Sequence, residues 1–141
     1  MEKLNAERAV DGDNTTCSKT KTTTDPWWEV DIGQTINVST IEIQNSQKHP
    51  LVIYVYVRRD THGEGRRCGV KHILEGGETR LISCVPPVSG SAVKILRRGK
   101  QQSLSLCEVH VFDDTGQYIT YYNSTLHILG AVRRKNSLSQ F

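Results

Sequence analysis

Apolar and polar residues alternate at every second position in four stretches of the chain, which is the pattern of strands that bury one face. These stretches cover residues 28–32, 51–57, 93–95 and 107–111. No segment keeps a helical apolar stripe over three turns. Clusters of turn-forming residues stand at 31–34, 61–65, 75–78 and 86–90. Many short strands joined by glycine- and proline-rich turns predict an all-β sandwich or jelly roll.

The strand pattern also indicates where the domain ends. The chain has 141 residues, which is enough for one domain with a sizeable core. The last strand that fits the sandwich ends near residue 112. We therefore expect a domain at 1–112 and a C-terminal extension or linker at 113–141. Within the extension, Tyr118–Leu129 has the composition of a strand, and Arg133–Phe141 has that of a polar tail.

Cysteines and glycosylation sequons favour an extracellular location. Four well-separated cysteines without a C-x-x-C pair fit structural disulfides better than a zinc ribbon or a thioredoxin-type site. N-glycosylation is predicted at Asn14, Asn37 and Asn123 if the chain enters the secretory pathway. No apolar run approaches the roughly eighteen residues of a membrane helix, and no signal-peptide core follows Met1. We expect a secreted or extracellular domain without membrane insertion, in which either the native protein is longer at its N-terminus or Met1 is not the biological start.

The charge balance does not call for a nucleic-acid partner. The 18 Lys and Arg residues exceed the 15 Asp and Glu residues by a net charge of only +3. Basic residues do occur in short runs, but these runs are not interleaved with aromatic residues of the kind that stack on bases. The runs stand at 58–59, 66–67, 97–98 and 133–135. Clustered positive charge leaves weak binding of anionic glycans open as a function.

No catalytic constellation is visible in the sequence. A G-x-S-x-G elbow, a phosphate-binding loop and an H-E-x-x-H motif are all absent, so we predict that the chain is not an enzyme. The five histidines show no metal-binding spacing, and His110 is expected to be hydrogen-bonded within its strand. Of Trp27 and Trp28, at least one is expected in the core rather than in an aromatic platform for sugars.

Acidic residues near two of the cysteines suggest a metal site. Residues 9–17 place the carboxylates of Asp11 and Asp13 around a glycine turn that ends at a cysteine, and Glu108 directly follows Cys107. If the two cysteines pair, their Cα atoms lie within roughly 7 Å and Glu108 approaches the acidic loop. Such an oxygen-only cluster suits Ca²⁺. Without that pairing, the loop reads as a solvated turn.

Five motifs follow one another along the chain: AVDGD at 9–13, CSKT at 17–20, PWWEVDIG at 26–33, GETR at 77–80 and SLSLCEV at 103–109. From about residue 5 to residue 112, this succession resembles the F-type lectin (fucolectin) domain, which belongs to the discoidin-like jelly rolls. The resemblance implies a non-enzymatic β-sandwich that recognises a carbohydrate, with a glycan or glycoprotein as partner.

The resemblance also implies a covalent frame and a structural metal. It pairs Cys17 with Cys107 and Cys68 with Cys84. It assigns one structural Ca²⁺ to the first loop and to the residue after the last cysteine. By position, the ligands are the side chains of Asp11, Asp13, Thr16 and Glu108 and the carbonyl groups of Arg8 and Cys107.

Two departures from the family pattern change what we expect. No opening strand precedes the AVDGD turn, so one sheet edge is unpaired unless the C-terminal extension or an upstream segment fills it. The fucose-binding His and Arg residues are also not kept, since their positions and the adjoining rim hold Lys19, Ser46, Lys48 and His49, and the second Arg has no clear counterpart. Lysine does not reproduce the bidentate geometry of arginine. We expect a retained metal site and poor binding of free fucose.

Three functions fit the sequence. The leading interpretation is a calcium-stabilised carbohydrate-recognition module whose loops at the metal end bind a glycan or a protein. A rival from another class is a structural or adhesive domain of a larger extracellular protein, without affinity for sugars. The third is a binder of anionic polysaccharides that acts through basic side chains such as Lys19, Lys48, Arg58 and Arg59.

Overall fold

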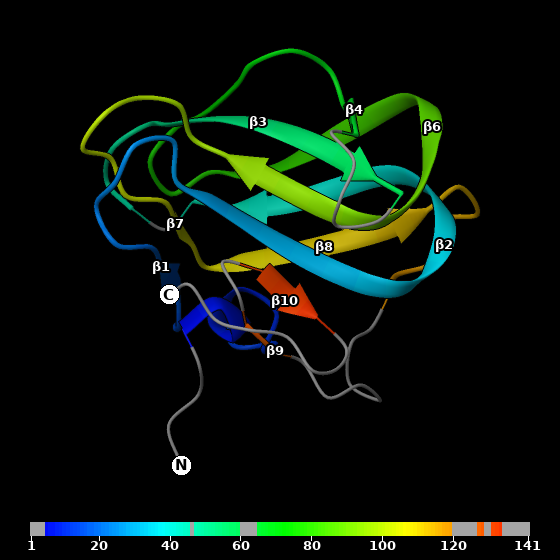
Figure 1. Cartoon of the computed structure of the whole chain (residues 1–141), viewed down its shortest axis with the longest axis horizontal. Helices are drawn as coiled ribbons and strands as arrows, with labels where there is room; N and C mark the ends of the chain where they lie inside the picture. Colours follow the sequence, from blue (N-terminus) through cyan, green and yellow to red (C-terminus); the bar gives the residue numbers. More distant parts are fainter. Residues whose placement is uncertain (1–4, 46, 60–64, 120–126, 129–130, 134–141) are drawn as a thin grey trace.

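The structure is a computed structural model that describes residues 5–45, 47–59, 65–119, 127–128 and 131–133 (Figure 1). These residues form one 3₁₀ helix and ten strands, and no α-helix is present among them. The elements are η1 (Asn5–Ala9), β1 (Ser18–Lys19), β2 (Trp27–Gln44), β3 (Leu51–Arg58), β4 (Arg66–Arg67), β5 (His72–Leu74), β6 (Thr79–Leu96), β7 (Ser105–Leu106), β8 (Glu108–Asp113), β9 (His127–Ile128) and β10 (Ala131–Arg133). The predicted all-β class is confirmed.

Two long antiparallel strands, β2 and β6, run through both layers of the sandwich. Their pairing shifts register between Asp31 and Ile36 and again between Val38 and Thr40, and both strands curve strongly in Figure 1. In the first layer, the last part of β6 lies between β3 and the first part of β2. In the second layer, the last part of β2 lies between the first part of β6 and β8.

Two of the predicted turns are bends inside these long strands. Residues 31–34 lie within β2 and residues 86–90 within β6, so the expectation that the chain leaves the sheet there is wrong. Gly33 has a φ of 84°, a conformation that glycine adopts without steric cost. Gly90 permits close packing, because a Cβ atom there would lie 2.6 Å from the carbonyl oxygen of Arg58. By contrast, the predicted turn at 75–78 is present, closed by a hydrogen bond from Glu78 N to Glu75 O.

The predicted inward direction of the apolar residues is confirmed, although the acids Glu29 and Glu108 that alternate with them are buried as well. Inward-facing side chains of both layers form one hydrophobic cluster that includes Val30, Ile41, Ile53, Ile95 and Val109. Trp28 is fully buried, and its indole Nε1 donates a 3.0 Å hydrogen bond to the carbonyl oxygen of Ala6 in η1. Trp27 on the opposite face remains partly exposed. At least one of the two tryptophans is therefore in the core, as expected.

The C-terminal extension takes part in the sheet. After β8, residues to Ile119 fold back, and Ile119 N donates to Val111 O. Further along, the backbone of β10 pairs in parallel with β2, with Ala131 opposite Glu29, and β9 pairs antiparallel with β10. The extension thus occupies an edge of β2 that the sequence left open. Of the predicted strand segment and polar tail, residues 120–126, 129–130 and 134–141 lie outside the described residues.

Candidate functional site

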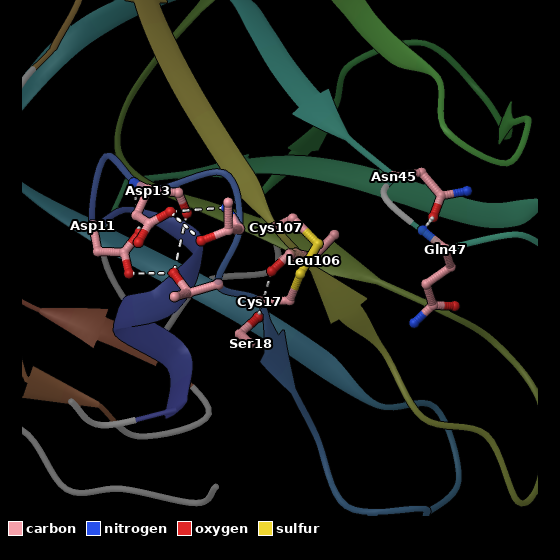
Figure 2. Close-up of a disulfide and its surroundings, with 10 residues drawn as sticks. Asp11, Asp13, Cys17, Ser18, Asn45, Gln47, Leu106 and Cys107 are labelled. Atoms are coloured by element: carbon pink, nitrogen blue, oxygen red, sulfur yellow. Dashed lines mark hydrogen bonds between the residues drawn. A yellow bond between two sulfur atoms is a disulfide. The ribbon is translucent and has the colours of Figure 1, made fainter. Parts of the chain in front are cut away.

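The two predicted disulfides are both formed. Cys17 and Cys107 have a Cα–Cα distance of 3.9 Å, and Cys68 and Cys84 one of 4.5 Å. Beside the first disulfide, β1 pairs antiparallel with β7, with Ser18 opposite Leu106. This pairing brings the acidic loop of residues 9–17 to the start of β8 (Figure 2).

The acidic loop is held by its own hydrogen bonds. The carboxylate of Asp11 accepts from the backbone N of Asp13 at 2.9 Å and from Thr16 Oγ1 at 2.5 Å. The Asp13 carboxylate accepts from both the backbone N and the hydroxyl of Thr15, at 2.9 and 2.5 Å. Gly12 has a φ of 77°, which allows the tight turn between the two acids. The loop therefore presents Asp11 and Thr16 together, while Asp13 bonds to Thr15.

Glu108 of β8 is the buried acid of the site. Its side chain is only 8% exposed, and Oε2 lies 3.0 Å from Nε2 of His110. Burial raises the pKa of Glu108 to about 7; His110 opposes this rise, and the neighbouring Asp11 carboxyl adds to it. Among the described residues, Glu108 Oε1 is buried without a hydrogen-bond partner. Buried acceptor atoms normally have a hydrogen-bond partner, so a cation or a hydrogen-bond donor is expected next to Glu108 Oε1.

The donor set suits a hard cation, although it is smaller than expected. Within the described part of the chain, no three His, Cys, Asp or Glu side chains gather as a metal-binding group. The expected group of three carboxylates is therefore not formed among the described residues: Asp11 neighbours Glu108, whereas Asp13 accepts from Thr15. The remaining side-chain oxygens are those of Asp11, Thr16 and Glu108. Oxygen ligands of this kind fit Ca²⁺.

A cavity of about 640 Å³ opens beside this cluster on the outward face of the second layer. Glu42 of β2 and His110 of β8 lie opposite one another there, with His110 Nδ1 2.9 Å from Glu42 Oε1. The ring of Tyr118 packs 5.0 Å from that of His110. Asp13 and Glu108 also line the cavity, and its described lining contains no lysine or arginine. The expectation that His110 is hydrogen-bonded is confirmed.

Sequence reasoning missed several residues of this cavity, among them Glu42 and Tyr118. Glu42 lies between the core residues Ile41 and Ile43, so its side chain is predicted to point outward. This alternation does not predict which residue the side chain contacts. Its partner His110 lies 68 positions along the chain, and only the register of β2 against β8 joins them. Tyr118 falls in the extension, where the one predicted site was N-glycosylation at Asn123.

The predicted sugar rim is only partly described. Lys19 on β1 and Lys48 and His49 after β2 are exposed, and Ser46 lies outside the described residues. Asn45 is fully buried and supports this loop: its side-chain Nδ2 donates to the carbonyl oxygen of His49 at 3.0 Å, and its Oδ1 accepts from Gln47 N at 3.1 Å. In the view of Figure 2, the disulfide lies between the acidic loop and this Asn45 loop.

The other predicted surface residues have mixed positions. Asn14 and Asn37 are exposed, and Asn37 donates to Asp114 Oδ2 at 3.1 Å, whereas Asn123 lies outside the described residues. Arg58 is buried and bonds to Glu29 at 2.6 Å. It is therefore not an exposed anion-binding group, which corrects one residue of the anionic-glycan alternative.

Comparisons with known proteins agree with this architecture. A family model described as "NedA-like, galactose-binding domain" matches residues 8–95. Fucolectin-5 of Anguilla japonica is 27% identical over 115 residues, which are 77% of this chain and 60% of that protein. Fucolectin-1 of the same species is 29% identical, over 77% of this chain and 64% of that protein. The chain thus spans less than two thirds of the length of these relatives.

Solved structures show the same fold. A serum F-lectin (fucolectin) from Morone saxatilis superposes with a TM-score of 0.67 at 28% identity, covering 75% of this chain and 41% of that chain. Chitosan-binding module 1 from a chitosanase/glucanase of Paenibacillus sp. IK-5 gives a TM-score of 0.63 at 21% identity, over 76% of this chain and 83% of that chain, a likeness of fold. No helix in the described ranges is long and apolar enough to cross a membrane.

Proposed function

The chain belongs to the family of NedA-like, galactose-binding domains of the F5/F8 type C class, and from this membership we propose that it is a non-enzymatic carbohydrate-recognition module of an extracellular protein. The resemblance to the discoidin-like fucolectins and the predicted β-sandwich are both confirmed. Two disulfides are consistent with an oxidising, extracellular compartment.

The cavity beside Glu108 is the observation that carries the proposal. Carbohydrate hydroxyls both donate and accept hydrogen bonds, and the cavity offers carboxylate acceptors next to the ring nitrogens of His110. Tyr118 adds an aromatic face against which the apolar side of a sugar ring packs. A volume of about 640 Å³ lies within the usual range of small-molecule sites. Because the described lining is acidic, we expect a neutral sugar rather than an anionic one.

A structural Ca²⁺ completes the proposed module. We assign it to Asp11, Thr16 and Glu108 with the carbonyls of Arg8 and Cys107, and we keep Asp13 as a ligand only if its carboxylate leaves Thr15. The cation would supply positive charge to two neighbouring carboxylates and a partner for Glu108 Oε1. These residues would thereby hold the acidic loop in place at the mouth of the cavity.

Calorimetric titration in the presence of Ca²⁺ tests the proposal, with galactose, fucose and neutral oligosaccharides as ligands. Glu42→Gln removes a charged acceptor from the cavity and is expected to weaken binding by about 10- to 100-fold. Glu75→Gln is the matched control, because it removes the same charge from an exposed turn. If no neutral sugar binds, or if both variants bind alike, the cavity is not the carbohydrate site.

A further inference from the structure

The outward face of the first layer carries alternating aromatic and basic side chains. The buried residues Trp28, Val55 and Ile95 point inward from its three strands, so their sequence neighbours point outward. Strand pairing sets Tyr54 opposite Leu96 and Tyr56 opposite Lys94. We call this surface the aromatic–cationic face; its members are Trp27 of β2, Tyr54 and Tyr56 of β3, Arg67 of β4, Lys94 of β6 and Arg98, two residues after the end of β6.

Cation–π contacts and a hydrogen bond hold these rings and cations together. The Lys94 ammonium lies 5.0 Å from the centroid of the Trp27 ring, and the Arg98 guanidinium lies 5.1 Å from that of Tyr54. Both distances are in the range of cation–π attraction. Arg98 also donates a 3.4 Å hydrogen bond to the Tyr56 hydroxyl. All three rings remain partly exposed, and Arg67 and Arg98 are exposed.

The face is positively charged although it includes an acid. Glu29 lies opposite Lys94 in the register, but it is only 2% exposed and bonds to Arg58 at 2.6 Å. The negative charge of Glu29 is thus offset within the sheet. A ligand reaching this surface meets the basic groups of Arg67, Lys94 and Arg98 between aromatic rings.

We propose that the aromatic–cationic face binds an acidic polysaccharide, a chain of sulfated or uronate sugars. Sugar rings would pack against the exposed parts of Tyr54 and Trp27, while sulfate or carboxylate groups would pair with the guanidinium and ammonium groups. A polysaccharide is favoured over a nucleic acid because the two disulfides indicate an oxidising compartment. This site lies on the layer opposite the Glu42 cavity, so it is a second function beyond the proposed one.

Heparin affinity is the test, measured by titration of the whole chain at 0.15 M NaCl, a roughly physiological ionic strength. The double variant Lys94→Gln and Arg98→Gln is expected to bind heparin about 2- to 30-fold more weakly, since two charge contacts are lost. The matched control, Lys21→Gln with Lys100→Gln, removes the same charge from exposed positions that are not members of the face and should bind as the wild type does. Tyr54→Leu keeps the charge of the face but removes an aromatic ring. It should therefore weaken the part of heparin binding that remains at higher salt concentration.

Three results would overturn this assignment. Equal losses in the double variant and its control would mean that heparin senses only net charge. An unchanged heparin affinity of Tyr54→Leu would show that the aromatic rings do not contribute to binding. Binding of a single-stranded oligonucleotide as tight as that of heparin, with the same response to the variants, would make a nucleic acid the occupant. Galactose titration of the same variants separates the two sites, because a defect at this face leaves the Glu42 cavity unaffected.

Discussion

Arg58 of β3 donates a 2.6 Å charge-assisted hydrogen bond to Glu29 of β2 across the intervening strand β6. The side chains are 10% and 2% exposed, so the pair is nearly buried although it lies on the outward side of the sheet. Each ion has given up most of its hydration and depends on the other for compensation. The pair therefore fixes how β2, β6 and β3 lie against one another.

Removing one partner of this pair is expected to be severely destabilising. Arg58→Met should lower the free energy of unfolding by about 3–5 kcal/mol, because the Glu29 charge stays buried without this partner. Denaturant unfolding measures the loss. Arg66→Met, at an exposed neighbouring residue, is the control and should change the free energy of unfolding by no more than about 0.5 kcal/mol. Similar losses in the two variants would contradict the buried-pair argument.

Opening the disulfide between Cys17 and Cys107 should destabilise the domain more than opening the other. The two bonds close spans of 90 and 16 residues, for which chain entropy gives about 4.6 and 3.1 kcal/mol. Unfolding of the two Cys→Ala double variants, one for each bond, measures the difference. Peptide mapping without reductant checks the pairing, and a peptide that links Cys17 to Cys68 or Cys84 would refute it.

Chelation of Ca²⁺ should lower the melting temperature of the wild type. Binding to the native state stabilises by about 2.7 kcal/mol at a hundredfold excess over the dissociation constant, so the shift must grow with Ca²⁺ concentration. Glu108→Gln should reduce this response. In excess chelator the same variant should be at least as stable as the wild type, because it removes a buried charge beside Asp11. Identical melting curves with Ca²⁺ and with chelator would exclude the metal.

Free fucose is expected to bind poorly. The resemblance implies a sugar site with charged donors, each contributing about 1.5–3 kcal/mol, and assigns Lys19 and Ser46 to the positions of two of them. Losing two such bonds weakens binding by about a hundredfold or more. Titration calorimetry with fucose and fucosylated oligosaccharides checks this. Sub-millimolar binding that disappears in Lys19→Ala would show that the rim still recognises fucose through different residues.

Strand positions could be predicted where one face alone is buried. The alternation at 51–57 and at 107–111 indicated both the strands and their inward residues, and the structure agrees. The bends at 31–34 and 86–90 could not be distinguished from turns, because glycine and proline mark both. Whether the chain stays in the sheet there depends on the long pairing of β2 with β6, which involves residues far apart in the sequence.

The candidate site was predictable only in its local part. The acidic loop and its cysteine neighbours follow directly from residues 9–17 and 106–109 and from the family resemblance. The direction of the Asp13 carboxylate was not predictable, because Thr15 competes for it through two short hydrogen bonds. The contact between Glu42 and His110, and the aromatic–cationic face, arise from strand register alone. Such contacts leave no signal in a single sequence.

The disulfide between Cys17 and Cys107 also determines how the domain would carry mechanical load. It closes a covalent loop that contains residues 18–106, and therefore β2, β3 and β6. A pulling force applied to the two ends of the chain enters this loop at one cysteine and leaves at the other. The tension crosses a single covalent bond and bypasses the hydrogen bonds between the long strands. Only the segment before Cys17, with η1, and the elements from β8 onward would extend, so β2, β3 and β6 would stay paired under tension until a reductant opened that bond.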